Sequence, residues 1–78
     1  MQGANKDIIE YFLSHTAEDK DNFKAKMQKL LNQSPLYIEK YFINEKDFSV
    51  RELDILCEHF KINIDDIFAY LDKKENKI

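Results

Sequence analysis

The 78-residue chain has one glycine, one proline, one cysteine, two histidines and no tryptophan. So few glycines and prolines leave little material for tight hairpins, and no glycine-rich phosphate-binding loop is present. One cysteine and two histidines cannot supply the four ligands of a structural zinc site. We therefore expect neither a metal nor another cofactor, and we expect that the protein is not an enzyme.

Long apolar runs and an excess of positive charge are also missing. No run approaches the roughly 20 apolar residues of a membrane-spanning helix, and no secretory signal pattern opens the chain. We therefore expect a cytoplasmic protein with no membrane partner. The net charge of −3 argues mildly against nucleic acid as a partner, although a local basic face can suffice.

The residues that are present predict a small helical domain. Hydrophobic residues make up 44% of the chain and aromatic residues 13%, which is enough to build one core. Apolar residues recur at intervals of three and four, the period of an amphipathic helix. We expect disorder at residues 1–4 and 74–78, and a single domain over residues 5–73. Its expected helices span residues 5–15, 17–32, 35–43, 50–60 and 65–73.

Capping signals set several of these boundaries. Ser34 followed by Pro35 marks a helix start, because serine is a preferred N-cap and proline is favoured at the first helical position. Ser49 with Glu52 three residues later predicts a capping box. Asn5 is expected to cap the first helix, and Thr16–Asp19 resembles a second capping box. Asn32 is expected to end the second helix in the left-handed conformation.

The apolar stripes of these helices predict the core. Cys57 falls on the stripe of the fourth helix, so we expect a buried, unreactive thiol. The expected core residues are Ile9, Phe12, Met27, Leu31, Ile38, Leu53, Leu56, Cys57, Phe60, Ile64 and Phe68.

The second half of the chain resembles the last two helices of the Cro/C1-type, lambda-repressor-like helix-turn-helix family. In that family a Leu-x-x-Ile-Ala-x-x-Leu helix precedes a small turn and a Ser-hydrophobic-Asp-Glu-Leu-Phe helix. The matching residues here are Leu53, Leu56, Cys57, Phe60, Ile62, Asn63, Ile64, Asp65, Asp66, Ile67 and Phe68. Upstream, residues 27–34 align with the family's Leu-Ala-x-x-Leu-Gly-Val-Ser, and Ile38 stands at a core position of the recognition helix. The resemblance covers about residues 23–68 and implies an all-α, compact five-helix domain.

The chain departs from the family where function would lie. Gln28 replaces a small alanine, Phe42 replaces a frequent glutamate, and Asn44 replaces a frequent glycine. The family reads DNA bases near the start of the recognition helix and one turn later, usually with polar or basic residues. Those positions hold Pro35, Leu36, Tyr37, Glu39 and Lys40 here. The recognition helix is therefore degenerate.

Two functions remain open from the sequence. The resemblance implies a small DNA-binding transcriptional regulator of phage or mobile-element type, whose third helix enters the major groove of an operator. In that interpretation Ser34, Tyr37 and Lys40 reach phosphates or base edges. Lys24, Lys46 and Arg51 contact flanking phosphates.

The alternative is an antirepressor that binds a protein partner, such as a repressor, instead of DNA. Leu36 and Tyr37 would then form an apolar anchor, and the acidic chain would suit a basic target. In either case a homodimer could form through the last helix. Its expected dimer contacts are Ile67, Tyr70 and Leu71.

Overall fold

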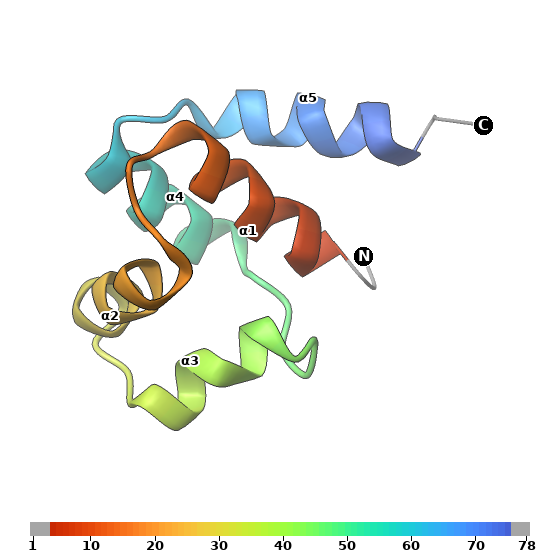
Figure 1. Cartoon of the computed structure of the whole chain (residues 1–78). Helices are drawn as coiled ribbons and strands as arrows, with labels where there is room; N and C mark the ends of the chain where they lie inside the picture. Colours follow the sequence, from red (N-terminus) through yellow and green to blue (C-terminus); the bar gives the residue numbers. More distant parts are fainter. Residues whose placement is uncertain (1–3, 76–78) are drawn as a thin grey trace.

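Five helices form the part of the chain that the computed structural model describes, residues 4–75, and that part contains no strand. The helices are α1 (Ala4–His15), α2 (Lys20–Leu31), α3 (Pro35–Phe42), α4 (Val50–Phe60) and α5 (Ile64–Glu75). The all-α prediction is confirmed. α5 packs on α1 at one side of the molecule, and α3 lies at the opposite side, against α2 (Figure 1).

Most predicted boundaries agree with the structure to within two residues, and α4 matches its predicted range. At the two ends, α1 begins at Ala4 and α5 continues through Lys74 to Glu75, so these three positions, which were expected to be disordered, are helical in the structure. Lys74 also forms an ion pair of 3.7 Å with Asp7, which ties the end of α5 to α1. The rest of the expected disorder concerns residues 1–3 and 76–78, which lie outside the described residues.

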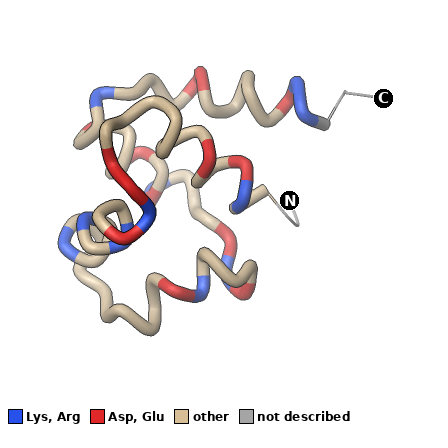
Figure 2. The backbone as a smooth tube through the Cα atoms, in the orientation of Figure 1, with Lys and Arg blue, Asp and Glu red and all other residues tan. Residues whose placement is uncertain are grey.

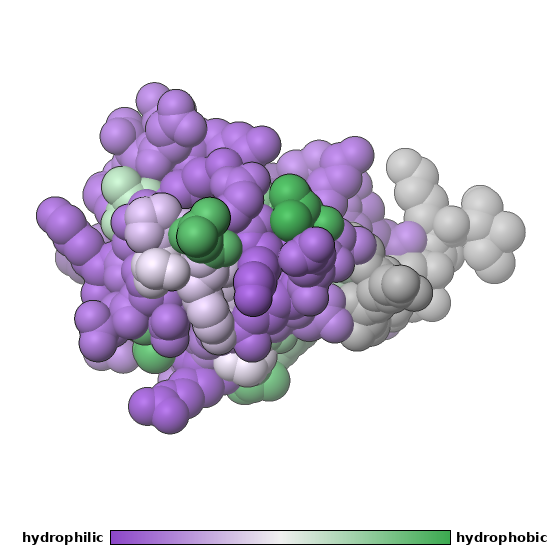
Figure 3. All heavy atoms as spheres, turned by 90° about the horizontal axis from the view of Figure 1, so that it is seen from below, coloured by the Kyte–Doolittle hydropathy of each residue, from purple (hydrophilic) through white to green (hydrophobic). Residues whose placement is uncertain are grey.

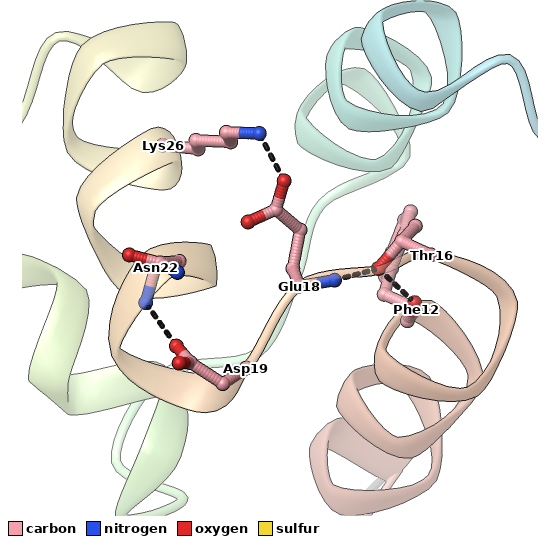
Figure 4. A network of polar contacts seen from close by, with 6 residues as sticks. All are labelled: Phe12, Thr16, Glu18, Asp19, Asn22 and Lys26. Carbon is pink, nitrogen blue, oxygen red and sulfur yellow. Dashed lines mark hydrogen bonds and ion pairs between the residues drawn. The ribbon is translucent and has the colours of Figure 1, made fainter.

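The largest boundary error is the start of α2, which begins three residues later than predicted. The Thr16 hydroxyl does not cap α2; it donates a 2.8 Å hydrogen bond back to the last turn of α1 and accepts one from the Glu18 amide (Figure 4). Asp19 is the N-cap instead, and its carboxylate accepts a 2.8 Å hydrogen bond from the Asn22 amide. Threonine can satisfy the backbone on either side of a helix junction, and here it closes α1.

The predicted caps of α3 and α4 are confirmed. The Ser34 hydroxyl accepts from the Tyr37 amide at 3.2 Å, with Pro35 at the first helical position. Ser49 and Glu52 form the expected reciprocal capping box at the start of α4. Asn32 ends α2 with φ 53° and ψ 50°, the left-handed conformation that asparagine tolerates.

The core is confirmed in large part, with one change of register in α5. Seven of the expected residues are buried: Ile9, Phe12, Met27, Ile38, Leu53, Leu56 and Cys57. The expected residues Leu31, Phe60 and Ile64 are partly buried and pack against this cluster.

Phe68 was expected in the core but keeps 41% of its surface exposed, whereas Ile67 and Leu71 are buried. The reason is the packing of α5 on α1, which turns the Ile67–Leu71 edge of its apolar stripe inward. The Tyr70 ring lies at the margin of this contact, 5.2 Å from the Tyr11 ring of α1. The apolar periodicity of α5 is compatible with burial of either Phe68 or the Ile67–Leu71 edge, and the contact with α1 decides between them.

Asn5 does not cap α1, as the sequence suggested, but lies inside its first turn and is only 2% exposed. Its side-chain amide donates to the carbonyls of Tyr41, at 3.0 Å, and Lys46, and its oxygen accepts from the Phe48 amide at 3.4 Å. A buried amide must be hydrogen-bonded to avoid a desolvation penalty, and here all its partners lie at the end of α3 or in the loop to α4. Asn5 therefore fixes α3 and this loop to α1.

Candidate functional site on helix α3

A short turn, residues 32–34, joins α2 to α3. The left-handed Asn32 turns the chain, and the Gln33 amide donates a 3.1 Å hydrogen bond back to the Gln28 carbonyl. Ser34 then starts α3, which packs mainly against α2. The turn needs no glycine, because asparagine supplies the left-handed residue.

The two faces of α3 differ sharply. Ile38 and Tyr41 point into the core and are at most 1% exposed. On the opposite face, Leu36 is 81% exposed, Lys40 is exposed, and Ile43 just beyond the helix is 53% exposed. Their spacing of four and three residues places these side chains in one line, which we call the α3 stripe (Leu36, Lys40 and Ile43). Seen from the α3 side, the surface shows separate hydrophobic patches within a hydrophilic surround (Figure 3).

On one side of the α3 stripe, Lys24 of α2 contacts side chains of α3. The Lys24 ammonium forms a 2.7 Å ion pair with Glu39 and lies 4.7 Å from the centre of the Phe42 ring. Lys24 was predicted to contact a DNA phosphate, but its charge is already satisfied within the chain. Phe42 supplies the apolar surface on which this lysine rests. Lys24 therefore contributes little free positive charge to the surface.

The other flank is formed by the loop between α3 and α4. The Lys46 ammonium lies 5.4 Å from the Tyr37 ring centre and 5.9 Å from the Tyr41 ring centre. The Tyr41 hydroxyl donates to the Glu52 carboxylate, so the loop is held between α3 and α4. Burial and this hydrogen bond both raise the pKa of Tyr41 well above its ordinary value. Tyr41 is therefore a neutral structural group rather than a reactive one.

Glu52 is kept as a charged partner in this arrangement. Burial by itself would raise its pKa, but the hydrogen bonds from Tyr41 and Ser49 outweigh that effect and lower it. A carboxylate that stays ionised can hold both the start of α4 and the tyrosine of α3. This connection was not found in the sequence, where Glu52 appeared only as a capping residue.

Two of the predicted basic residues meet at a hollow beside the turn. Lys46 and Arg51 both line a cavity of about 520 Å³ between the end of α2 and the start of α4, together with Gln33. Arg51 is exposed, and Ser34 lies next to Gln33 in the chain. The structure thus places Ser34, Lys46 and Arg51 around the turn, with the α3 stripe running away from it.

Two of the three predicted dimer contacts are buried inside the chain. Ile67 is fully buried and Leu71 is 5% exposed, so the interior of one chain already uses both side chains. Tyr70 remains partly exposed, with the Lys74 ammonium 5.4 Å from its ring centre. The exposed apolar residue of α5 is Phe68, so a contact through this helix would have to use Phe68 rather than Ile67 or Leu71.

Sequence reasoning missed two residues of this region. Ile43 stands seven residues after Leu36, so helical spacing could have placed it on the same face. The position of Asn5 could not have been found in this way, because its partners lie 36 to 43 residues away in the chain.

Comparison of the chain with protein-family models, with curated proteins and with solved structures gives no match. Across residues 4–75, no helix is both long and apolar enough to cross a membrane. The same residues contain no group of three or more histidine, cysteine or acidic side chains arranged to hold a metal ion. Cys57 is buried without a disulfide, and burial raises the pKa of its thiol.

Proposed function

We propose that the protein is a small Cro/C1-like DNA-binding transcriptional regulator that places α3 in the major groove of double-stranded DNA. The observation that carries this proposal is the α2–turn–α3 arrangement with the whole α3 stripe exposed. A major groove about 12 Å wide admits an α-helix, and helix-turn-helix proteins present the second helix of the motif to it. The lambda-repressor-like fold is part of the same proposal, supported by the order of the five helices and by the left-handed Asn32 and Asn44 at its turns.

The residues of the proposed DNA interface have different roles. Lys40, at the centre of the α3 stripe, reaches a guanine edge or a phosphate. Lys46 and Arg51 contact phosphates beside the groove, together with the Ser34 end of α3. Leu36 touches a thymine methyl group. Figure 2 shows few charged positions on α3 compared with α2, so we expect modest affinity that depends on these contacts.

The test is a titration of the protein against DNA flanking its own gene, followed by fluorescence anisotropy over a series of salt concentrations. Each phosphate contact releases counterions, so log Kd should rise with log salt at about 0.9 per contact. With Lys40, Lys46 and Arg51 in contact, we expect a slope of about 2–3 per chain. Absence of binding at low salt, to this DNA and to unrelated DNA, would overturn the proposal.

A second candidate function rests on the apolar character of the α3 stripe. Leu36 and Ile43 are far more exposed than most large apolar side chains of the chain, and neither is needed to fill the core. Exposed apolar side chains that surround a basic residue fit a protein interface better than a polar groove. An antirepressor that covers the DNA-binding face of a basic repressor would use such a surface, and the net charge of −3 suits that partner.

Leu36→Lys separates the two functions. On DNA it adds a positive charge near the backbone and should increase affinity. In a protein interface it buries an unpaired ammonium, which should cost several kcal/mol, at least about 2, and dissociate the complex. The variant is titrated against DNA and against any protein that copurifies with the wild type. Unchanged behaviour in both assays would mean that the start of α3 is not the functional surface.

A further inference from the structure

A second hollow lies away from the turn, between α1 and the end of α3. Its volume is about 490 Å³, within the range of roughly 300–1,000 Å³ that small-molecule sites occupy. Its apolar walls are formed by Ile9 and Leu13 of α1 and by Phe42 and Ile43. We call it the α1–α3 groove. It shares Ile43 with the α3 stripe, but the proposed functions use none of its other lining residues.

The polar groups at the base of the α1–α3 groove are already engaged. Both the amide group and the oxygen of Asn5 are hydrogen-bonded to the backbone of α3 and of the loop that follows it. The Tyr41 hydroxyl donates to Glu52. The base therefore offers little hydrogen bonding to a ligand, and water gains little by staying there. An apolar group is the occupant that these walls favour.

The rim of the groove carries positive charge. Lys6 and Lys20 line it, and among the described residues neither forms an ion pair. Glu10 is the acidic residue of the rim. Lys20 also lies 5.7 Å from the centre of the Phe42 ring, and two lysines without an ion pair against one glutamate leave the rim net positive, which favours an anionic group there.

We propose that the α1–α3 groove binds a small amphipathic carboxylate, with its hydrocarbon part between α1 and Ile43 and its carboxylate at the lysines of the rim. The walls explain the apolar part, the rim explains the charge, and the volume limits the ligand to the size of a small molecule. This inference does not depend on DNA binding and stands or fails separately from it.

The first experiment uses the full chain and three probes of the same length: decanoate, decanol and decyltrimethylammonium, each below its micelle concentration. Binding is followed by amide chemical shifts in ¹H–¹⁵N spectra. We expect saturable shifts around Leu13, Ile43 and Asn44, with decanoate bound at least about tenfold more tightly than the cation. Equal binding of the cation, an absence of saturable shifts, or shifts centred on Val50 and Phe68, the exposed apolar residues of α4 and α5, would overturn the proposal.

The second experiment uses variants. Ile43→Asp should weaken decanoate binding by at least about tenfold, because it places a carboxylate in the wall. Leu36→Asp is the matched control, since it makes the same kind of change at the exposed start of α3 and should leave binding unchanged. The double variant Lys6→Gln, Lys20→Gln leaves the apolar walls intact, so it should reduce decanoate binding to the level of decanol without affecting decanol. The opposite pattern, with Leu36→Asp effective or with decanoate unaffected by loss of the lysines, would contradict the assignment.

Discussion

Helices α3 and α4 begin in the same way and then serve different purposes. Each starts at a serine N-cap, and each buries a stripe of apolar residues, Ile38 and Tyr41 in α3 and Leu53, Leu56 and Cys57 in α4. Beyond Val50 in its first turn, which is 65% exposed, the outer face of α4 carries the polar side chains of Arg51, Asp54, Glu58 and His59. The outer face of α3 exposes the apolar ends of the α3 stripe. Our proposal assigns this apolar surface of α3, which the core does not need, to contact with a partner.

A substitution on the buried face of α4 should cause the largest loss of folding stability. Leu56→Ala removes a fully buried side chain and should lower the free energy of unfolding by about 2–5 kcal/mol, a large share of a small domain's stability. Urea denaturation followed by circular dichroism measures this loss. The control is Asp54→Ala on the exposed face of the same helix, which should change stability by less than about 0.5 kcal/mol. Similar stability of the two variants would mean that the inward face of α4 has been misplaced.

Replacing Asn5 should destabilise the end of α3 and the loop after it more than it destabilises the rest of the domain. Asn5→Ala removes the hydrogen bonds to the backbone of α3 and its loop and leaves those buried groups unpaired, at a cost of about 1–3 kcal/mol or more. Hydrogen exchange should accelerate at the end of α3 and in the loop before it does in the middle of α4. Asn22→Ala, an exposed change in the first turn of α2, is the control. Uniform acceleration in both helices would show that α3 is not an independently attached element.

The two serine caps should differ in strength. Ser49 exchanges two hydrogen bonds with Glu52, whereas Ser34 accepts one from the Tyr37 amide. Each serine-to-alanine change removes one hydroxyl acceptor and should cost about 0.5–2 kcal/mol, with Ser49→Ala at the upper end because it also breaks the reciprocity of the capping box, in which the Ser49 backbone amide keeps its bond to Glu52. Thermal unfolding of the two variants gives the comparison. A greater loss for Ser34→Ala would show that the first turn of α3 carries more of the stability than its single cap bond suggests.

The outer face of α3 should give the smallest effect on folding. Leu36 is 81% exposed, so Leu36→Lys should change the unfolding free energy by less than about 0.5 kcal/mol while altering the binding of a partner. Chemical denaturation is the measurement. A substantial loss of stability would mean that Leu36 packs against the fold, and the apolar α3 stripe would then have a structural explanation.

The sequence predicted features that depend on neighbouring residues better than features that depend on contacts between distant helices. The starts of α3 and α4 could be predicted, because Ser34–Pro35 and Ser49 with Glu52 act within one turn of helix. The burial of Ile67 rather than Phe68 could not be predicted, since both fit the apolar stripe of α5 and the packing on α1 decides between them.

The sequence indicated individual residues of the candidate site but not how they lie relative to one another. The sequence indicated Ser34, Leu36, Lys40, Lys46 and Arg51. The structure places Leu36 and Lys40 on α3 and Ser34 at its N-cap, whereas Lys46 and Arg51 line the hollow between the end of α2 and the start of α4. The sequence could not show that Lys24 is paired with Glu39, because that contact joins two helices whose relative rotation is set by the core. Charge counted along the chain therefore overestimated the free positive charge of this surface.

The most direct test of the account compares Lys40→Ala with Lys73→Ala in DNA titrations over a salt series. Both lysines are exposed and both changes remove one charge, so any effect of net charge is the same. If α3 enters the groove, Lys40→Ala should weaken binding and, where it contacts a phosphate, lower the salt slope by about one unit, while Lys73→Ala on α5 stays close to the wild type. Equal effects of the two changes, or a larger effect of Lys73→Ala, would contradict the placement of DNA on α3.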